Sequence, residues 1–428
     1  MDRDLIALGF VVLLMLGLVL GIPIAVILLL LAGIGITLVA SIDVNAVLAT
    51  AFHAQMSTWS LTALPLFVFM GEILTRSRTA ERMFESFVPF LAPVPGGLVQ
   101  VNIFASGLFS ALSGSSTATV ATIGKLCYPQ LQRRGYPDGL SIGSLAGSGT
   151  LGILIPPSVA LILYGFAADV SIGKLFLAGI VPGLMIMAMF SAYAGLRLRG
   201  LRGEPDHYTG WQRMRAALNL IPFVVLIVIV LGSIYAGFAT PTEAAVLGVL
   251  GAAVLSVLDG SASFGMFRGA IRATVLFSAA IGFVLAASAA LQVAMAFTGI
   301  PRAVMGWVTD MNLGYYALLA IVALLIIALG CFIDGLSIIV LTSAVLFPVV
   351  SQAGVDMLWF GVFLVILIEI GLITPPIGFN LFVLQRVTGQ DIDRIALAAV
   401  PFILILLAAA VIVTFVPGLV TFLPSVIR

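Results

Sequence analysis

A double proline interrupts a long apolar stretch twice in this chain. The first copy reads Gly152-Ile153-Leu154-Ile155-Pro156-Pro157, and the second reads Gly371-Leu372-Ile373-Thr374-Pro375-Pro376. Proline removes a backbone hydrogen-bond donor and clashes with the preceding turn, so we expect a helix to break at each copy. Inside a bilayer, the carbonyl groups freed by a break need a partner from protein, water or an ion. Broken helices repeated in both halves of a membrane chain are typical of a transporter's binding site.

The composition is that of a membrane protein throughout. The 428 residues are 62% hydrophobic and 9% charged, whereas charged residues make up about 25% of an average soluble domain. Apolar runs of about 20 residues, each long enough to cross a hydrocarbon core of roughly 30 Å, recur from end to end. The sequence therefore predicts an all-α polytopic membrane protein without a sizeable soluble domain. The formal net charge of +1 gives no indication of nucleic-acid binding.

The first half divides into scaffold helices and a repeat unit. Residues 1–60 are predicted as N-terminal scaffold, and 41–60 of these as an external loop. Residues 5–40 should form two short spans joined by a turn at Gly21–Pro23, with one long kinked helix as the alternative. The first repeat, 61–196, is predicted to contain a span at 61–75, an interfacial arm at 83–97, a hairpin at 98–131, a broken helix at 140–168 and a span at 173–195.

After a central segment, 197–272, the second half is expected to repeat the same order of span, arm, hairpin, broken helix and span. The central segment is predicted as an arginine-rich cytoplasmic loop at 197–215, spans at 218–236 and 243–258, and a further cytoplasmic loop marked by Arg268 and Arg272. The second repeat, 273–416, is predicted to contain a span at 273–297, an arm at 301–312, a hairpin at 314–350, a broken helix at 358–385 and a span at 396–416. Residues 417–428 are predicted as a C-terminal tail.

The two re-entrant hairpins are predicted from small polar residues in the middle of long apolar segments. In the first these are Ser110, Ser113, Gly114, Ser115, Ser116, Thr117 and Thr119, and in the second Gly330, Asp334, Gly335 and Ser337. A single span that packs through its small residues explains either segment alone. The matched spacing favours hairpins, because Gly114 precedes Pro156 by 42 positions and Gly335 precedes Pro375 by 40.

The distribution of positive charge predicts that the hairpins enter from opposite sides. Arginine and lysine gather at cytoplasmic ends of membrane segments. Hairpin one is flanked by Arg76, Arg78, Arg82, Lys125, Arg133 and Arg134. Hairpin two is flanked by Asp310, Asn312, Gln352 and Asp356, with Arg302 as its nearest upstream cation. The sequence thus predicts an inverted repeat, the architecture of many secondary transporters.

The polar groups at the tips and breaks suit a hard cation. Freed carbonyl and hydroxyl oxygens are hard ligands, and glycine allows a second backbone to approach closely. Because hairpin one has no carboxylate at its tip, sodium is favoured over the proton as the coupling ion. The alternative is that the hydroxyl groups bond back to their own helices.

Four carboxylates within apolar stretches are functional candidates, because a carboxylate is costly to bury in a membrane. Asp334 is the strongest, since it lies at the predicted tip of hairpin two. Glu369 could instead cap a helix end, and Glu72 could be solvated near a cytoplasmic end. Glu243 follows Pro241 at a helix start, where an acidic residue favours the helix dipole.

The sequence gives no indication of a transition-metal site, an ATP-binding loop or a catalytic centre. Cys127 and Cys331 are the only cysteines and His53 and His207 the only histidines, so no transition-metal site is expected. A disulfide is the alternative to simple packing for the two cysteines. No P-loop and no nucleophile with a base appear. We therefore expect no enzyme activity and no cofactor.

Five stretches in family order resemble the large membrane (M) subunit of the tripartite ATP-independent periplasmic (TRAP) transporters. They are Pro65–Glu72, Ser110–Thr119, Gly149–Ser158, Pro241–Ala245 and Gly371–Phe382. The resemblance implies a bacterial inner-membrane, sodium-driven importer with an elevator-type motion. It also implies a small four-helix membrane (Q) subunit, a periplasmic substrate-binding (P) protein, and organic acids such as C4-dicarboxylates or sialic acids as cargo.

By the family's pattern, one sodium ion would lie near Ser110, Ser113, Gly152, Ile155 and Pro157, and another near Gly330, Gly371, Thr374 and Ile377. The residues facing the substrate would come from the hairpin tips: Ser115, Ser116, Thr117, Asp334 and Ser337. A stand-alone sodium/carboxylate or ion antiporter of similar architecture, without a binding protein, is the alternative within transport. A channel-like protein is the alternative outside it, and it predicts neither an inverted repeat nor sodium dependence.

Overall fold

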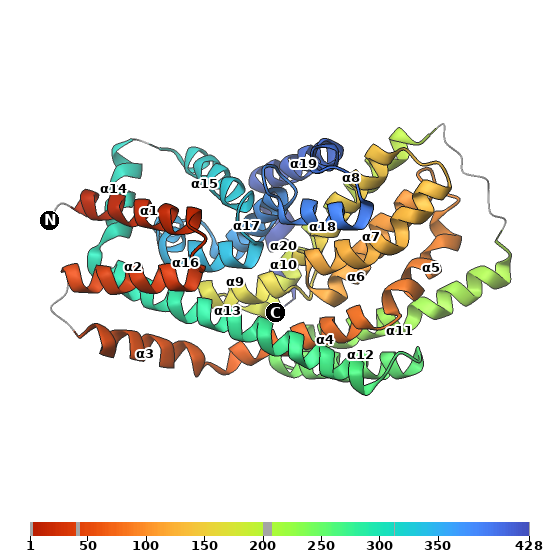
Figure 1. Ribbon diagram of the computed structural model, residues 1–428, viewed down its shortest axis with the longest axis horizontal. Coiled ribbons are helices and arrows are strands. Elements are labelled where there is room, and N and C mark those ends of the chain that lie inside the picture. Colours follow the sequence, from red (N-terminus) through yellow and green to blue (C-terminus); the bar gives the residue numbers. More distant parts are fainter. Residues whose placement is uncertain (1–2, 40–42, 200–207, 312, 428) are drawn as a thin grey trace.

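The computed structural model describes residues 3–39, 43–199, 208–311 and 313–427, and in these ranges the regular structure is entirely helical (Figure 1). Six of the described helices are long and apolar enough to cross a membrane, and the bent pair Val44–Met56 with Trp59–Arg76 is a seventh candidate. The prediction of an all-α polytopic membrane fold is confirmed.

The two repeats contain helices in the same order. The first consists of α4 (Ala63–Arg76), α5 (Thr79–Leu91), α6 (Leu98–Ser113), α7 (Ser116–Arg133), α8 (Asp138–Thr150), the short helix η2 (Leu151–Ile153), α9 (Val159–Ala168) and α10 (Ile172–Arg197). The second consists of α13 (Phe264–Thr298), α14 (Ile300–Asp310), α15 (Tyr315–Gly330), α16 (Gly335–Gln352), α17 (Met357–Leu372), α18 (Phe379–Thr388) and α19 (Ile392–Phe415).

Both predicted hairpins and both predicted breaks are present. The pair α6–α7 turns at Gly114 and Ser115, and the pair α15–α16 turns at residues 331–334. The double prolines fall in the gaps between η2 and α9 and between α17 and α18, and both proline–proline bonds are cis. Figure 1 shows hairpin one on the right of the molecule and hairpin two on the left, so they enter from opposite ends.

The remaining helices frame these elements. They are α1 (Arg3–Val19), α2 (Ile24–Val39), α3 (Val44–Met56), η1 (Trp59–Thr62), α11 (Gly210–Tyr235), α12 (Pro241–Leu258) and α20 (Gly418–Val426). The long helix α13 packs against α2, α3 and α4, and α4 also packs against α12. Helices α3, α4, α12 and α13 form a scaffold along the lower side of the molecule in Figure 1, beneath the hairpins and breaks.

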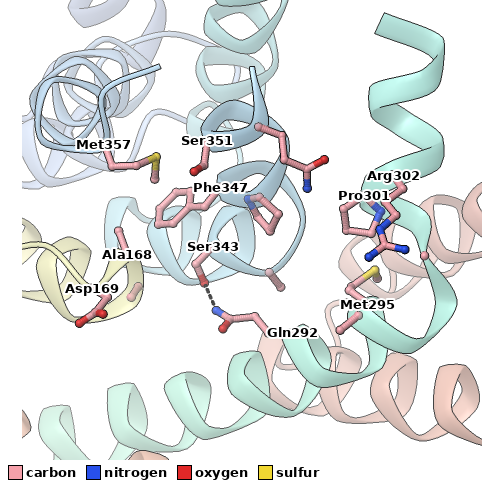
Figure 2. Close-up of a pocket in the computed structure, with 16 residues that line it drawn as sticks. Ala168, Asp169, Gln292, Met295, Pro301, Arg302, Ser343, Phe347, Ser351 and Met357 are labelled. Atoms are coloured by element: carbon pink, nitrogen blue, oxygen red, sulfur yellow. Dashed lines mark hydrogen bonds between the residues drawn. The ribbon is translucent and has the colours of Figure 1, made fainter. Parts of the chain in front are cut away.

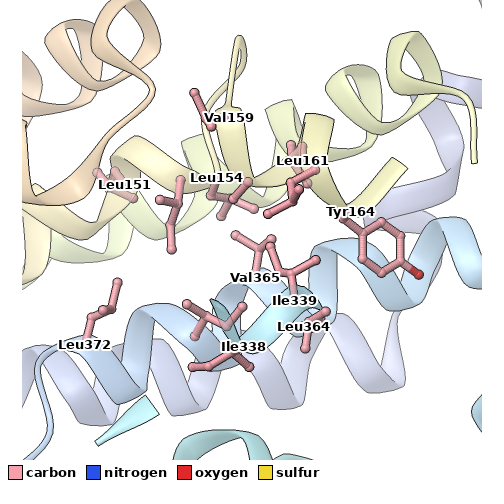
Figure 3. Close-up of a cluster of buried hydrophobic side chains, with 14 of the residues drawn as sticks. Leu151, Leu154, Val159, Leu161, Tyr164, Ile338, Ile339, Leu364, Val365 and Leu372 are labelled. Atoms are coloured by element: carbon pink, nitrogen blue, oxygen red, sulfur yellow. The ribbon is translucent and has the colours of Figure 1, made fainter. Parts of the chain in front are cut away.

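A buried apolar core joins the two breaks. Figure 3 shows residues around the first break facing residues of α16 and α17 in the second repeat: Leu151, Leu154, Val159, Leu161 and Tyr164 face Ile338, Ile339, Leu364, Val365 and Leu372. In α17 every residue from Trp359 to Leu372 is buried. A helix that is almost entirely apolar belongs in a protein interior. Apart from Glu369 this holds for the buried stretch of α17, which packs the two repeats together as one body.

The structure corrects the predictions at four places. The predicted loop 41–60 contains α3, which Asp43 begins by accepting the backbone N–H of Asn45, and which packs on α13. Arg268 and Arg272 lie within α13 rather than in a loop, because Ser263 caps that helix through the N–H of Met266. One prediction in this region is confirmed rather than corrected. Helix α1 ends at Val19 and α2 begins at Ile24, so residues 5–39 form two helices joined by a turn and not one kinked helix.

The other two corrections concern the central loop and the C-terminal tail. The loop 197–215 gives way to α11 at Gly210, where Thr209 and Gln212 form a reciprocal capping box. Its middle, 200–207 with Arg202, lies outside the described residues. The tail contains α20, whose apolar residues pack against α10. Short apolar segments of this kind fold because a neighbouring helix covers them, which local sequence does not reveal.

We expect cysteines at Gln132 and Asp310 to be labelled from opposite faces of the membrane. Gln132 lies at the base of hairpin one and Asp310 at the end of α14, just before hairpin two, and both are exposed. Labelling with a membrane-impermeant maleimide in intact and in opened vesicles measures this. If both cysteines react from the same face, the inverted repeat is wrong.

Candidate functional site

The tip of hairpin one is a cluster of hydroxyl groups packed against the first break. Thr119 Oγ1 lies 3.3 Å from Ser110 Oγ and 3.1 Å from Ser113 Oγ, and it donates to the carbonyl of Ser115 at 2.9 Å. Ser110 is fully buried. The predicted residues Ser110 and Ser113 therefore come together, and Thr119 joins them.

Two glycines allow the break and the tip to touch. Gly114 has a left-handed backbone (φ 63°), and a Cβ there would lie 2.9 Å from Val159 Cγ2 and 3.5 Å from the carbonyl oxygen of Pro157. A Cβ at Gly152 would lie 3.0 Å from the carbonyl oxygen of Ser115 and 3.2 Å from Ser110 Oγ. Gly152 and Pro157 thus lie against the hydroxyl cluster.

Ile155 takes a different position. Its side chain faces α10, where a Cβ at Gly183 would meet Ile155 Cγ1 at 2.8 Å. Ile155 can therefore contribute to a cation site at the first break only through its backbone.

The second break meets hairpin two through backbone. A Cβ at Gly330 would lie 2.7 Å from the Cα of Gly371, and a Cβ at Gly371 would lie 2.6 Å from the Cα of Gly330. After the break, the N–H of Gly378, next to Ile377, donates to the carbonyl of Cys331 at the hairpin tip (3.1 Å). The hydroxyl of Thr374 donates to the carbonyl of Ile370 at 2.6 Å, which leaves its lone pairs available to a cation.

Asp334 caps the start of α16, the returning helix of hairpin two. Its Oδ1 accepts the backbone N–H groups of Leu336 and Ser337 at 3.1 Å each, and its Oδ2 accepts the hydroxyl of Ser337. This is an N-cap, which satisfies the free N–H groups at a helix start. Asp334 still lines the cavity described next, whereas Ser337 lies buried behind it.

Both hairpin tips line one cavity of about 700 Å³, which we call the tip cavity. Ser115, Ser116 and Thr117 line it from hairpin one and Asp334 from hairpin two. Gly71, Glu72 and Thr75 of α4 and Phe277 of α13 close it on the scaffold side. Four of the five predicted substrate-facing residues therefore line one cavity, and the fifth, Ser337, donates its hydroxyl to Asp334 from behind it.

Two cations of the tip cavity are not evident from the sequence. Lys125 of α7 and Arg386 of α18 line the cavity and are exposed, and neither has an ion-pair partner within the described ranges. Glu72 is already paired with Arg76 at 2.9 Å, and Asp334 is occupied by its helix start. The two free positive charges make the cavity suited to an anion. Lysine and arginine are common at the ends of apolar segments for reasons of membrane topology alone, so the sequence does not single these two residues out as cavity lining.

The structure also shows the surroundings of two further candidate carboxylates, Glu243 and Glu369. Glu243 forms a capping box with Thr240, whose N–H it accepts at 2.8 Å, so its helix-start interpretation is confirmed. Glu369 is fully buried in α17, and neither of its carboxylate oxygens has a hydrogen-bond partner among the described residues. Asn380, in α18 beyond the second break, is buried and unpartnered in the same way.

Comparison with known proteins identifies the family. Residues 10–419 match the family model described as "Tripartite ATP-independent periplasmic transporter, DctM component". The chain belongs to this family. As a family member with several apolar helices, it is a multi-pass inner-membrane protein.

Individual relatives carry several substrate names. The C4-dicarboxylate TRAP transporter large permease protein DctM of Pseudomonas aeruginosa is 34% identical over 88% of this chain and 89% of its own length. The ectoine/5-hydroxyectoine TRAP transporter large permease protein UehC of Ruegeria pomeroyi is 33% identical over 85% of this chain and 86% of its own length. These relatives are transporter permease subunits, not enzymes.

A solved structure supports the fold. The crystal structure of the Alcanivorax borkumensis YdaH transporter, described as having an unusual topology, matches with a TM-score of 0.63. The match covers 94% of this DctM-family chain and 98% of the other chain, at 16% sequence identity. At that identity the likeness concerns the fold alone.

Proposed function

We propose that the chain is the transport subunit of a sodium-coupled secondary importer of organic acids. Its cargo is a C4-dicarboxylate, a sialic acid or a similar carboxylate, delivered by a periplasmic binding protein. A small four-helix membrane subunit completes the system. One observation carries the proposal: both hairpin tips line a single cavity together with Lys125 and Arg386, and neither of these cations forms an ion pair with another described residue.

The tip geometry supports sodium as the coupling ion. At the first break, three hydroxyl groups and the carbonyl groups of Ser115 and Pro157 gather without a carboxylate. At the second, glycine backbones meet beside Thr374. Oxygen ligands with little charge of their own suit a hard monovalent cation held at broken helices.

An elevator-type motion is supported by the division of the protein into a packed body of hairpins and breaks and a separate scaffold. The hairpins and breaks share the core of Figure 3 and would move together as one body. They meet the scaffold at close backbone contact, because a Cβ at Gly71 of α4 would lie 2.5 Å from the carbonyl oxygen of Ser113. A glycine at this contact presents no side chain that would interlock the two bodies there, which favours sliding of one on the other.

We expect Ser113→Ala and Thr374→Val to raise the sodium concentration needed for half-maximal uptake. A hydrogen bond to a charged group is worth about 1.5–3 kcal/mol, so a comparable ion–oxygen contact corresponds to a loss of roughly tenfold to hundredfold in sodium affinity. Thr374→Val keeps the branched shape of the side chain. Uptake measured against sodium, alongside the melting temperature in detergent, tests this.

Thr414→Val is the matched control for the sodium experiment. Thr414 also donates its hydroxyl to the carbonyl four residues earlier, Ala410, at 2.8 Å, but it lies in α19 away from both breaks. Its loss should leave the sodium curve unchanged. Lower melting temperatures with unshifted sodium curves in Ser113→Ala and Thr374→Val would mean that these hydroxyl groups only tie helices together.

A further inference from the structure

A second cavity lies beside the base of hairpin two. It has a volume of about 480 Å³, within the 300–1,000 Å³ typical of small-molecule sites. Figure 2 shows its walls: α16 of hairpin two, the junction of α13 and α14, and the end of α9 at Asp169. We call it the outer cavity, because hairpin two is predicted to enter from the outside.

The two cavities extend in opposite directions from the hairpin tips. The tip cavity follows hairpin one and α18 as far as Lys125 and Arg386. The outer cavity follows α16 from Ser343 to Ser351 and Gln352 at its base. The same conformation therefore presents one cavity toward each end of the molecule, and the two share no lining residue.

The outer cavity contains a cation suited to one carboxylate. Arg302, in the first turn of α14, is exposed at its wall and makes no ion pair with any residue that the structure describes. A guanidinium stays charged and offers a planar fork of donors that matches a carboxylate. Ser351 and Gln352 add uncharged hydrogen-bonding groups to the cavity.

The rest of the lining disfavours a second carboxylate. Asp169 lies across the cavity from Arg302 (Figure 2) and is exposed. Between them, the amide of Gln292 donates to the hydroxyl of Ser343 at 3.3 Å, and that hydroxyl lies 3.0 Å from Ser288 Oγ. These groups can bond to hydroxyl or carbonyl groups of a ligand, whereas an anion beside Asp169 would be repelled.

We propose that the outer cavity is a second organic-acid site, which holds a hydroxylated monocarboxylate with its carboxylate on Arg302. The uncharged end of the acid lies toward Gln292, Ser343 and Asp169. This inference rests on the proposed function, because it assigns a first station on the outer side to the same class of cargo. It also makes that station selective for acids with one carboxylate over those with two.

Protection of introduced cysteines from a maleimide tests the outer cavity. Gln352→Cys reports on the outer cavity and Ala121→Cys on the tip cavity, since each residue lines only one of them. The two native cysteines are buried, so the unsubstituted chain sets the background. The probes are gluconate and N-acetylneuraminate as hydroxylated monocarboxylates and succinate as a dicarboxylate, applied to the full chain with its small subunit.

We expect a monocarboxylate to protect Gln352→Cys, and Arg302→Gln to raise its half-protecting concentration roughly tenfold to hundredfold. Arg302→Gln should leave protection of Ala121→Cys unchanged, and Arg386→Gln should do the reverse. Succinate should protect Gln352→Cys only after Asp169→Asn. These three results together would establish both the site and its selectivity.

Two outcomes would overturn the outer site alone, and a third would also overturn the proposed function. The outer site is wrong if gluconate or N-acetylneuraminate protects Ala121→Cys while Gln352→Cys stays fully reactive to the maleimide. It is equally wrong if protection of Gln352→Cys does not depend on Arg302. Failure of every acid to protect either cysteine would refute the proposed organic-acid cavity and the outer site with it.

Discussion

Gly371→Ala is expected to reduce uptake to background. The added Cβ would lie 2.6 Å from the Cα and 2.9 Å from the carbonyl carbon of Gly330, and 3.3 Å from the carbonyl oxygen of Ile327. All three atoms belong to the backbone, so no side-chain rotation can relieve the contact. Overpacking of a tight core typically costs about 1–3 kcal/mol, and here the strain falls directly on the second break.

The reciprocal substitution and a control make this result specific. Gly330→Ala should have the same effect, because its Cβ would lie 2.7 Å from the Cα of Gly371. Gly306→Ala in α14 meets no atom within 4 Å and should behave as the unsubstituted chain. Uptake and melting temperature in detergent are the measurements. Full transport by Gly371→Ala would show that hairpin two and the second break do not touch during the cycle.

Lys125→Gln and Arg386→Gln are each expected to raise the apparent KM for the organic acid roughly tenfold to hundredfold, the scale of a lost charged hydrogen bond. Both side chains are exposed in the tip cavity, so the fold should not depend on them. The sodium dependence should stay unchanged, since both lie away from the breaks. Initial uptake rates against substrate and against sodium separate these effects.

Arg394→Gln controls for the loss of a positive charge. Arg394 pairs with Asp138 at 3.5 Å on the surface of the protein and lines neither cavity. Exposed pairs of this kind are worth about 0–1 kcal/mol, so its KM should be unchanged. A KM that is unmoved in both Lys125→Gln and Arg386→Gln would remove these residues from the substrate path.

The breaks and hairpins could be predicted because their causes are local. A double proline cannot continue a helix, and Gly114 and Asp334 begin turns that their own residue types favour. The repeat followed from matched spacing. The helices α3 and α20 could not be predicted, because packing against α13 and α10 stabilises them and overrides weak local propensity.

The sequence predicted what type of site lies at the hairpin tips, but not all of the residues that form it. The hydroxyl-rich tip of hairpin one, Thr119 included, was evident from its residues. That Thr119 joins Ser110 and Ser113 at the predicted cation site was not, because only the packing of α7 on α6 brings them together. Lys125 and Arg386 line the same cavity only because the two repeats pack together. Distances between repeats are set by the core of the protein, and no local pattern encodes them.

Uptake by the reconstituted system tests the central claim most directly. Proteoliposomes should contain this chain and its small membrane subunit, with the binding protein and a labelled organic acid outside. We predict accumulation driven by an inward sodium gradient, and none when the chain, the small subunit or the binding protein is left out. Full accumulation driven by a proton gradient in the absence of sodium would contradict the account.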